Sequence, residues 1–193
     1  MKVVIIKYNA GNIHSVRIAL QRLSLQPVVS DNIEIIGNAD KVIFPGVGEA
    51  SSAMQFLKDK GIAGLLTELK QPVLGICLGL QLMCRHSEEN DTECLDIFNI
   101  QVKKFPPLDK VPHMGWNTIE QCKGSLFRNI KNASYAYFVH SYYAEMDVLT
   151  VAHSEYILPF SAALQKDNFY AVQFHPEKSG RIGEQILKNF LEL

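Results

Sequence analysis

Short apolar runs alternate with helix-like segments through the first 84 residues, and this order constrains the fold more than any other feature of the chain. Each run has the length and composition of a buried strand, whereas the segments between them repeat their apolar residues at helical spacing. Such an order requires crossover connections, so we expect a parallel sheet flanked by helices, with a glycine turn at Gly11 and a helix break near Gly61. The predicted strands are Val3–Ile6, Gln26–Ser30, Lys41–Phe44 and Pro72–Ile76, and the predicted helices lie within residues 13–23, 51–70 and 79–84.

The second half of the chain changes character after a polar loop predicted at Ser87–Glu93. Short strands separated by turns dominate it, and a closing amphipathic helix follows at residues 182–190. We therefore predict one α/β domain over residues 1–193, with a mostly parallel central sheet, flanking helices and an antiparallel β extension packed on the sheet. The strands predicted in this half are Asn99–Lys104, Asn117–Glu120, Tyr135–His140, Val148–His153, Ser161–Gln165 and Tyr170–Phe174.

Charge and cysteine usage exclude several classes of protein. The 19 basic and 20 acidic side chains give a net charge of -1, which leaves no basic excess for a nucleic-acid backbone. The apolar run before Lys7 is too short for a secretory signal, and the longest uncharged stretch, Gln71–Cys84, is too short and too glycine-rich to span a bilayer. We expect a cytoplasmic protein with reduced thiols and, since no zinc spacing, P-loop or dinucleotide motif occurs, neither metal nor cofactor.

Cys77 lies where the fourth predicted strand meets a helix, with Gly75 and Gly79 two positions to either side. This is the pattern of a nucleophile elbow, in which glycines allow a sharp turn that lifts the central side chain above the strand ends. The start of the following helix also favours a thiolate over a thiol. Taken alone, the pattern fits a buried structural cysteine equally well. For Cys84, Cys94 and Cys122 we predict that structural role.

His175-Pro176-Glu177 supplies the partners that a nucleophilic cysteine needs. An imidazole takes the proton of the thiol, and a carboxylate orients the imidazole. Proline favours an extended backbone at His175, and residues two apart in an extended segment point to the same side, so we expect Glu177 to reach the ring. By itself this tripeptide would be a surface turn; together with the elbow it predicts a Cys-His-Glu triad.

Pro45-Gly46-Val47-Gly48 follows the third predicted strand. Backbone N–H groups at Gly46 and Val47, with that of Leu78 after the nucleophile, are candidates for stabilising the oxyanion of a tetrahedral intermediate. A glycine turn of this kind in isolation is usually structural.

Two of these motifs carry a family resemblance. G-I-C-L-G-L-Q-L around Cys77 and H-P-E at 175–177 resemble the class I (triad) glutamine amidotransferases, over essentially the whole chain. Four further segments are similar to the glutaminase-subunit family of imidazole glycerol phosphate synthase, an enzyme of histidine biosynthesis. They are Y-N-A-G-N-I-H-S-V from residue 8, P-G-V-G from 45, H-M-G-W-N from 113 and Y-F-V-H-S-Y from 137.

The resemblance implies a fold of the class I amidotransferase type and roles for individual residues. Cys77 attacks the glutamine amide, His175 protonates the leaving ammonia and later activates water, and Glu177 holds His175. Gln81 matches the substrate-binding glutamine of the family, although a solvated helix residue is the alternative. The stretch His140, Ser141 and Tyr142 matches the segment whose backbone holds the α-amino and carboxylate groups of the substrate. The chain has Lys7 where the family usually has aspartate, which argues against a salt bridge to a partner there.

A second protein is implied by the chemistry. Free ammonia is mostly protonated at neutral pH, so a synthetic glutaminase must pass it on, yet the motifs run from residue 8 to 177 and leave no room for an acceptor domain. The resemblance implies a heterodimer with a (βα)8-barrel cyclase subunit, which makes imidazole glycerol phosphate and an aminoimidazole carboxamide ribotide. Four residues match the family interface: Asn12, Trp116, Tyr137 and Lys178. For Trp116, the single tryptophan, core packing is the alternative.

Two other functions remain open from the sequence. The chain is either a glutaminase serving anthranilate, aminodeoxychorismate, guanylate or pyridoxal phosphate synthesis, or a non-catalytic module of the same fold that senses redox state through Cys77. The P-G-V-G and H-M-G-W-N segments argue against the first, and the retained His-Pro-Glu argues against the second.

Overall fold

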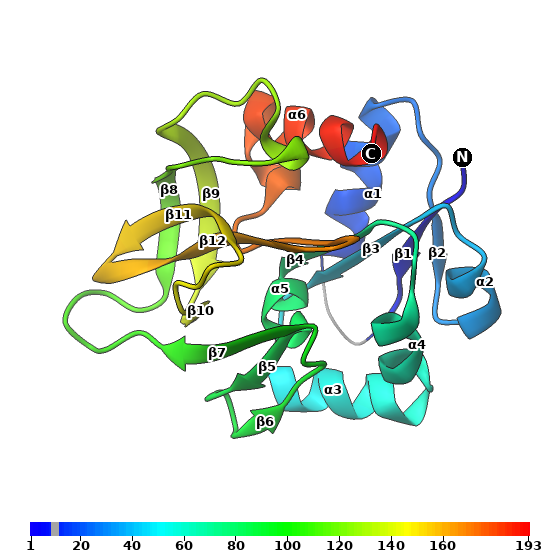
Figure 1. The fold of residues 1–193 in the computed structure, drawn as a ribbon, viewed down its shortest axis with the longest axis horizontal. Coiled ribbons are helices and arrows are strands. Elements are labelled where there is room, and N and C mark those ends of the chain that lie inside the picture. Colours follow the sequence, from blue (N-terminus) through cyan, green and yellow to red (C-terminus); the bar gives the residue numbers. More distant parts are fainter. Residues whose placement is uncertain (9–11) are drawn as a thin grey trace.

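The computed structural model describes residues 1–8 and 12–193, so the turn predicted at Gly11 lies outside the described residues. The central sheet of this part consists of β1 (Val3–Ile6), β2 (Val28–Ser30), β3 (Lys41–Gly46), β4 (Val73–Cys77), β11 (Thr150–Tyr156), β12 (Leu158–Lys166) and β13 (Phe169–Val172). Their order across the sheet is β11-β12-β13-β4-β3-β1-β2 (Figure 1).

The five strands from β13 to β2 are all parallel to their neighbours. The other two, β12 and β11, continue the same sheet through antiparallel pairing. The predicted parallel sheet with an antiparallel extension is therefore confirmed, but these two strands are hydrogen-bonded to its edge rather than packed on its face. Strands from both halves of the chain thus contribute to one continuous sheet.

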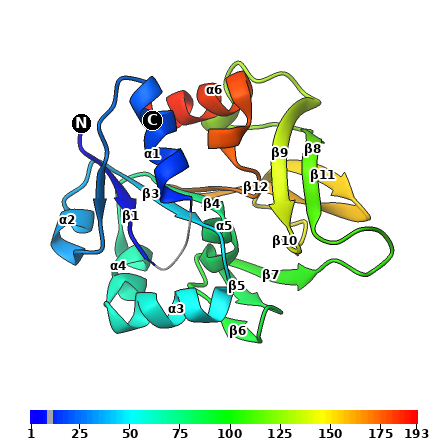
Figure 2. The same cartoon turned by 180° about the vertical axis from the view of Figure 1, so that it is seen from behind.

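Helices cover both faces of this sheet, as its doubly buried strands require. The helices are α1 (Ile13–Arg22), α2 (Ile33–Gly37), α3 (Ala50–Asp59), α4 (Ile62–Glu68), α5 (Leu78–Met83) and α6 (Gly180–Leu191), with 3-10 turns η1 (Ser125–Phe127) and η2 (Pro176–Lys178). Figures 1 and 2 show α1 and α6 on one side of the sheet and α3 and α4 on the other. No helix in the described residues is long and apolar enough to cross a membrane.

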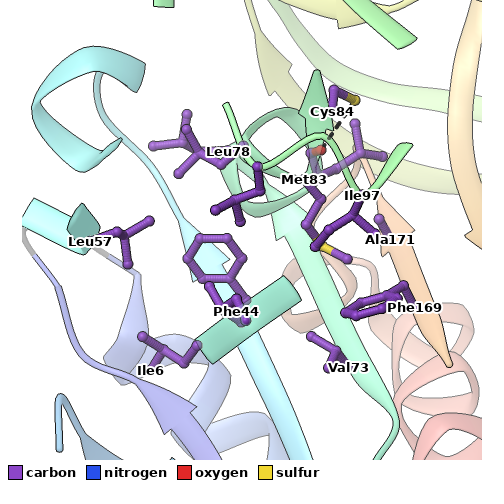
Figure 3. Packing of buried hydrophobic residues seen from close by; sticks show 14 of the residues in the cluster. Ile6, Phe44, Leu57, Val73, Leu78, Met83, Cys84, Ile97, Phe169 and Ala171 are labelled. Carbon is purple, nitrogen blue, oxygen red and sulfur yellow. Dashed lines mark hydrogen bonds between the residues drawn. The ribbon is translucent and has the colours of Figure 1, made fainter. Parts of the chain in front are cut away.

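Two hydrophobic cores result, one on each face, and β1 contributes to both because successive side chains of a strand point to opposite faces. Val3 and Ile5 pack with the side of α1 and α6. Val4 and Ile6 pack with the side of α3 and α4, where Phe44 and Leu57 are also buried (Figure 3). The strand is therefore buried on both of its faces.

Two smaller β structures complete the described chain. A four-stranded sheet contains β5 (Cys84–Ser87), β6 (Thr92–Glu93), β7 (Phe98–Lys104) and β10 (Tyr142–Ala144), and a two-stranded ribbon contains β8 (His113–Ile119) and β9 (Ser134–His140). The prediction of a loop over Ser87–Glu93 was wrong in part, because β5 and β6 pair as a hairpin there. The sequence also missed α2 and β10, which are too short to show a periodic pattern.

Candidate active site

The turn from β4 into α5 holds Cys77 in a strained backbone conformation, with φ 55° and ψ -107°. Strain of this kind is typical of a nucleophile elbow. The flanking glycines are needed for close packing: a Cβ on Gly79 would lie 1.9 Å from the carbonyl oxygen of Phe44, and one on Gly75 would lie 2.5 Å from Met83 Sδ. The two glycines that predicted the elbow are therefore required by the close packing around it.

Three neighbouring parallel strands end together around this cysteine. In the register of β3 and β4, Gly46 lies opposite Cys77. In the register of β13 and β4, Val172 lies opposite Ile76, which brings Gln173 level with Cys77. Ligands of open α/β sheets bind beyond the carboxyl ends of the strands. The elbow therefore lies where this fold places its functional groups.

His175 and Glu177 are both buried, and Nδ1 of the ring lies 2.7 Å from Oε1 of the carboxylate. The predicted contact is present, but its origin differs from the prediction. His175 is extended, whereas Pro176–Lys178 forms the 3-10 turn η2, and this turn folds the carboxylate back onto the ring. The carboxylate is thus on the Nδ1 side of the imidazole.

The charges around His175 favour its protonated form. Burial of the ring lowers its pKa, but the nearby charge of Cys77 and the hydrogen bond with Glu177 outweigh burial and raise the pKa to about 10. Nε2 has no hydrogen-bond partner among the described residues. The ring is consequently held by Nδ1, while Nε2 is left for a proton exchanged with the thiol or a substrate.

Asn12 completes this cluster from the start of α1. Its side-chain amide donates to Glu177 Oε1 and lies 3.2 Å from His175 Nδ1. The residue was predicted only as a partner contact, and it is half-buried. A contact across 163 positions leaves no local signal in the sequence.

A cavity of about 290 Å³ opens beside Cys77. Of the predicted oxyanion residues, Val47 and Leu78 line it, whereas Gly46 is buried at the end of β3 and is not among the described lining residues. All four predicted substrate residues line it as well. Among the described residues, those that line it are Val47, Gly48, Cys77, Leu78, Gln81, Glu89, Pro112, Val139, His140, Ser141 and Tyr142.

Gln81 is a buried residue and not a solvated one. Its Nε2 donates to the carbonyl of Tyr142 over 2.9 Å and to Gln173 Oε1 over 3.1 Å. The Tyr142 carbonyl also accepts from His140 Nδ1 over 2.8 Å, and the Ser141 carbonyl accepts from the Phe105 amide over 3.0 Å. These carbonyls at the cavity wall are therefore already engaged within the protein.

Within residues 1–8 and 12–193, no group of three or more His, Cys, Asp and Glu side chains has an arrangement that could hold a metal ion.

The comparisons with known proteins agree with this geometry. The family described as glutamine amidotransferase class-I matches residues 4–193. The chain belongs to the class I glutamine amidotransferases. The family inferred from the sequence motifs is thereby confirmed.

Individual relatives of this class I amidotransferase are similar over its full length. Imidazole glycerol phosphate synthase subunit HisH of Bacteroides fragilis (strain ATCC 25285) is 59% identical over 196 residues, covering 100% of both chains. The protein of the same description from Salmonella typhimurium (strain LT2) is 46% identical over 198 residues, again with 100% of both covered.

Solved structures share the fold at low identity. A putative GMP synthase subunit from Thermoplasma acidophilum has a TM-score of 0.74 at 18% identity, covering 100% of this chain and 93% of its own. A structure described as glutamine amidotransferase has a TM-score of 0.76 at 17% identity, covering 98% and 97%. Together they confirm the predicted fold class.

Three of the four residues predicted at a partner interface of this amidotransferase lie together on the β8–β9 ribbon or beside it. Trp116 lies opposite Tyr137, with ring centroids 5.9 Å apart, and Lys178 Nζ lies 5.8 Å from the Tyr137 centroid. Trp116 is 55% exposed, so core packing is excluded for it. The same face carries exposed Met114 and Tyr135, which were not among the predicted interface residues. We call Met114, Trp116, Tyr135 and Tyr137 the docking face.

Two lining residues of the amidotransferase cavity, Glu89 and Pro112, were also missed. Glu89 lies in the turn of the β5–β6 hairpin, within the segment predicted to be a polar loop. Its Oε2 accepts from the amide of Ala50 over 2.8 Å. Burial and the charge of Glu49 raise the pKa of its carboxyl group, although the bond from Ala50 opposes them. Because Glu89 is one of several polar residues in this segment, nothing in the sequence indicates that it lines the cavity.

Proposed function

We propose that this chain is the glutaminase subunit of imidazole glycerol phosphate synthase, acting in histidine biosynthesis in the cytoplasm. It hydrolyses glutamine to glutamate and ammonia and delivers the ammonia to a cyclase subunit. The observation that carries the proposal is the 59% identity over both full lengths with a protein of that description. The buried Cys77, His175 and Glu177 cluster supports the chemistry independently.

The reaction begins on the pair formed by the thiolate of Cys77 and the imidazolium of His175. The sulfur attacks the side-chain amide carbon of glutamine, and a tetrahedral intermediate forms. His175 Nε2 gives its proton to the amide nitrogen, the C–N bond breaks, and ammonia leaves a thioester behind. His175 then takes a proton from water, whose oxygen attacks the thioester and releases glutamate and the thiolate. Glu177 stabilises the imidazolium at each stage.

The oxyanion of both intermediates is assigned to the backbone at the elbow. Leu78 is the first residue of α5, so its N–H has no partner within the helix. Val47 faces the same cavity from the end of β3. With Gly46 beside them in the register of the sheet, these groups are the candidate donors.

Substrate recognition follows from what the cavity offers. Both N–H groups of Gln81 are engaged, which leaves its Oε1 for the substrate. His140, Ser141 and Tyr142 form the facing wall, and their segment is proposed to hold the amino-acid end of glutamine. The Tyr142 carbonyl already accepts two bonds, so we assign the positive α-amino group to the carboxylate of Glu89 and to the second lone pair of the Ser141 carbonyl.

Delivery of ammonia is assigned to the docking face. Val139 lies on the same side of the ribbon as Trp116 and Tyr137, and it also lines the cavity. The thiol of Cys77 lies 3.8 Å from the Val139 carbonyl. Ammonia released at the sulfur is thus one strand away from this face. A (βα)8-barrel cyclase bound to Trp116, Tyr137 and Lys178, with Asn12 nearby, would receive it before it reached bulk water.

Complementation tests the biological assignment. The gene is introduced into a histidine auxotroph that lacks the glutaminase subunit, and growth without histidine is expected only with Cys77 intact. Growth restored instead in strains requiring anthranilate, aminodeoxychorismate, guanylate or pyridoxal phosphate would assign another pathway. Labelling of Cys77 by a diazo-ketone analogue of glutamine excludes the redox-sensor alternative, since a sensor thiol has no reason to recognise glutamine.

A further inference from the structure

Gln173 is a buried polar residue that the reaction described above does not use. It follows β13 directly, beside Cys77 in the register of the sheet, and its side chain is 0% exposed. Burying a side-chain amide is unfavourable unless its N–H donors and its oxygen form hydrogen bonds. The hydrogen-bond partners of Gln173 therefore indicate what the residue does. Both ends of this amide contact residues of the candidate active site.

The hydrogen-bond pattern determines which way the amide points. The carbonyl of Tyr142 can only accept, so Gln81 must present its Nε2 there. The same nitrogen lies 3.1 Å from Gln173, which must therefore present Oε1 to it. This leaves Gln173 Nε2 facing the sulfur of Cys77, 3.6 Å away. A rotated Gln173 amide would place two donors against each other at one end.

We propose that Gln173 is a positioning residue that donates a hydrogen bond to the sulfur of Cys77 and at the same time holds the amide of Gln81. The inference rests on the proposed function, because it assigns Cys77 as nucleophile and Gln81 as a substrate contact. One rigid amide thus sets the position of the attacking atom relative to the group that holds the substrate.

The two contacts have separate physical consequences. An N–H donor stabilises a thiolate more than a thiol, because hydrogen bonds to a charged acceptor are the stronger ones. The bond therefore favours the reactive form of Cys77 and weakens when the sulfur becomes a thioester. The acceptor Oε1 instead restrains Gln81, so that its free oxygen points into the cavity before substrate arrives.

Two substitutions separate these contacts. Gln173→Met keeps the length of the side chain and removes both bonds. Gln173→Glu keeps the shape and an oxygen for Gln81, but replaces the donor with a carboxyl oxygen against the sulfur. Asn189→Leu is the matched control: Asn189 is also buried and bonded, to the carbonyls of Leu126 and Arg128, and it lies in α6 away from the cavity.

The first measurement is the pH dependence of alkylation of Cys77 by iodoacetamide, followed by mass spectrometry of its peptide. The other thiols are poor competitors, since burial raises the pKa of Cys94 to about 12 and that of Cys122 to about 11. The second measurement is kcat and KM for glutamine. The melting temperature of each variant shows whether the substitution destabilises the whole fold.

We expect the alkylation midpoint of Gln173→Met to rise by about one pH unit and kcat/KM to fall about tenfold, with a higher KM. Gln173→Glu should shift the midpoint further while its KM stays near that of the wild type. Asn189→Leu should lower only the melting temperature. A wild-type midpoint in folded Gln173→Glu, which is nearly isosteric, overturns the inference whether or not Gln173→Met folds. Alkylation needs no glutamine, so this result is distinct from failure of the proposed function, which shows as wild-type protein without glutaminase activity.

Discussion

The backbone amide of His175 donates to the carbonyl of Tyr137 over 2.8 Å, which ties the candidate general base directly to the docking face. The tie is reinforced by Ser179, whose hydroxyl accepts from the Tyr137 amide over 2.9 Å and donates to the His175 carbonyl over 2.7 Å. A partner chain that displaced Tyr137 would therefore displace the backbone of His175 as well, through these hydrogen bonds. This arrangement gives a physical route by which a bound cyclase can influence the triad.

Ser179→Ala removes the reinforcing bridge while leaving every triad side chain in place. We expect the free energy of unfolding to fall by about 1–3 kcal/mol, because the part-buried Tyr137 amide loses its acceptor, whereas the His175 carbonyl keeps only the bond from the Lys178 amide. We also expect weaker stimulation of glutamine hydrolysis by the cyclase, measured as the ratio of rates with and without it. Ser134→Ala, at the other end of β9, is the control. An unchanged ratio in Ser179→Ala would show that the route does not run through this hydroxyl.

Replacing Cys77 with Ala or Ser should abolish glutamine-dependent synthesis and spare ammonia-dependent synthesis by the partner. Only the thiolate route needs this side chain, and serine is a poor nucleophile in a site arranged for cysteine. The assay compares the two nitrogen sources with the same complex. Glutamine hydrolysis retained by the purified variant would remove Cys77 from the mechanism.

Glu177→Gln should lower kcat at least about tenfold while the domain stays folded, since the amide fills the space but cannot stabilise the imidazolium. The loss of charge should also lower the pKa of His175, which Glu177 helps to raise. Turnover and thermal unfolding are measured together, and Glu184→Gln on the exposed side of α6 is the control. Turnover equal to that of the wild type would show that another group orients the ring.

The segment Pro45 to Gly48 is the candidate switch for partner control, and the structure shows which substitution tests it. Gly48 has φ +131°, and no atom lies within 4 Å of the position that an alanine methyl would take, so Gly48→Ala disfavours the present backbone without a clash. A peptide turned away from the oxyanion site costs about 2.7–4 kcal/mol of transition-state stabilisation. The rate of glutamine hydrolysis is measured for the chain alone, with cyclase, and with cyclase plus its nucleotide ligand. We expect Gly48→Ala to change the ratios between these three rates.

Two controls accompany this experiment. Gly61→Ala carries the same kind of strain, with φ +70° and open space, at the junction of α3 and α4 far from the cavity. Gly46→Ala is expected to damage packing instead, because its methyl would lie 2.0 Å from the Tyr8 hydroxyl and 3.0 Å from Leu78 Cβ. Equal wild-type rates under all three conditions would dismiss the switch, and normal activation of Gly48→Ala would place it elsewhere.

Acid should destabilise the chain through two buried histidines of the β8–β9 ribbon. Burial lowers the pKa of His113 to about 4 and that of His140 to about 3, and the two rings share a 3.0 Å hydrogen bond. The unfolded chain binds protons at an ordinary pKa of about 6.5, so between that pH and the folded values it holds more protons than the native state. The free energy of unfolding therefore decreases as the pH falls below about 6.5, and at pH 5 the decrease is about 2 kcal/mol for each histidine.

The measurement for this prediction is thermal unfolding between pH 7 and pH 5. His113→Gln should reduce the loss of stability over that range, whereas His14→Gln, an exposed substitution on α1, serves as the control. An equal loss in the wild type and in His113→Gln would assign the acid sensitivity to other groups.

Local sequence patterns were sufficient to predict the order of strands and helices and to identify Cys77 as the candidate nucleophile. The order of strands and helices predicted a parallel sheet because apolar spacing reflects burial, which each strand or helix records in its own residues. The elbow at Cys77 and the neighbouring His175 and Glu177 were recognisable for the same reason, since their signals span only a few positions. The extended backbone predicted at His175 was confirmed, but its continuation through Glu177 was wrong, because proline restricts its own φ and its predecessor and does not decide the conformation of the residues after it.

The tertiary structure alone decided which distant side chains complete the site. Gln173 and Cys77 are 96 positions apart, and Asn12 and His175 are 163 apart, so no window of sequence contains either pair. Their proximity follows from the register of β13 on β4 and from the packing of α1 against η2. The role of a buried polar residue depends on which donor or acceptor the fold brings within hydrogen-bond distance, whereas an apolar residue needs only to be buried. For that reason the sequence by itself determined the layers of this protein and its nucleophile, and only the folded chain determined the polar contacts that hold the nucleophile in place.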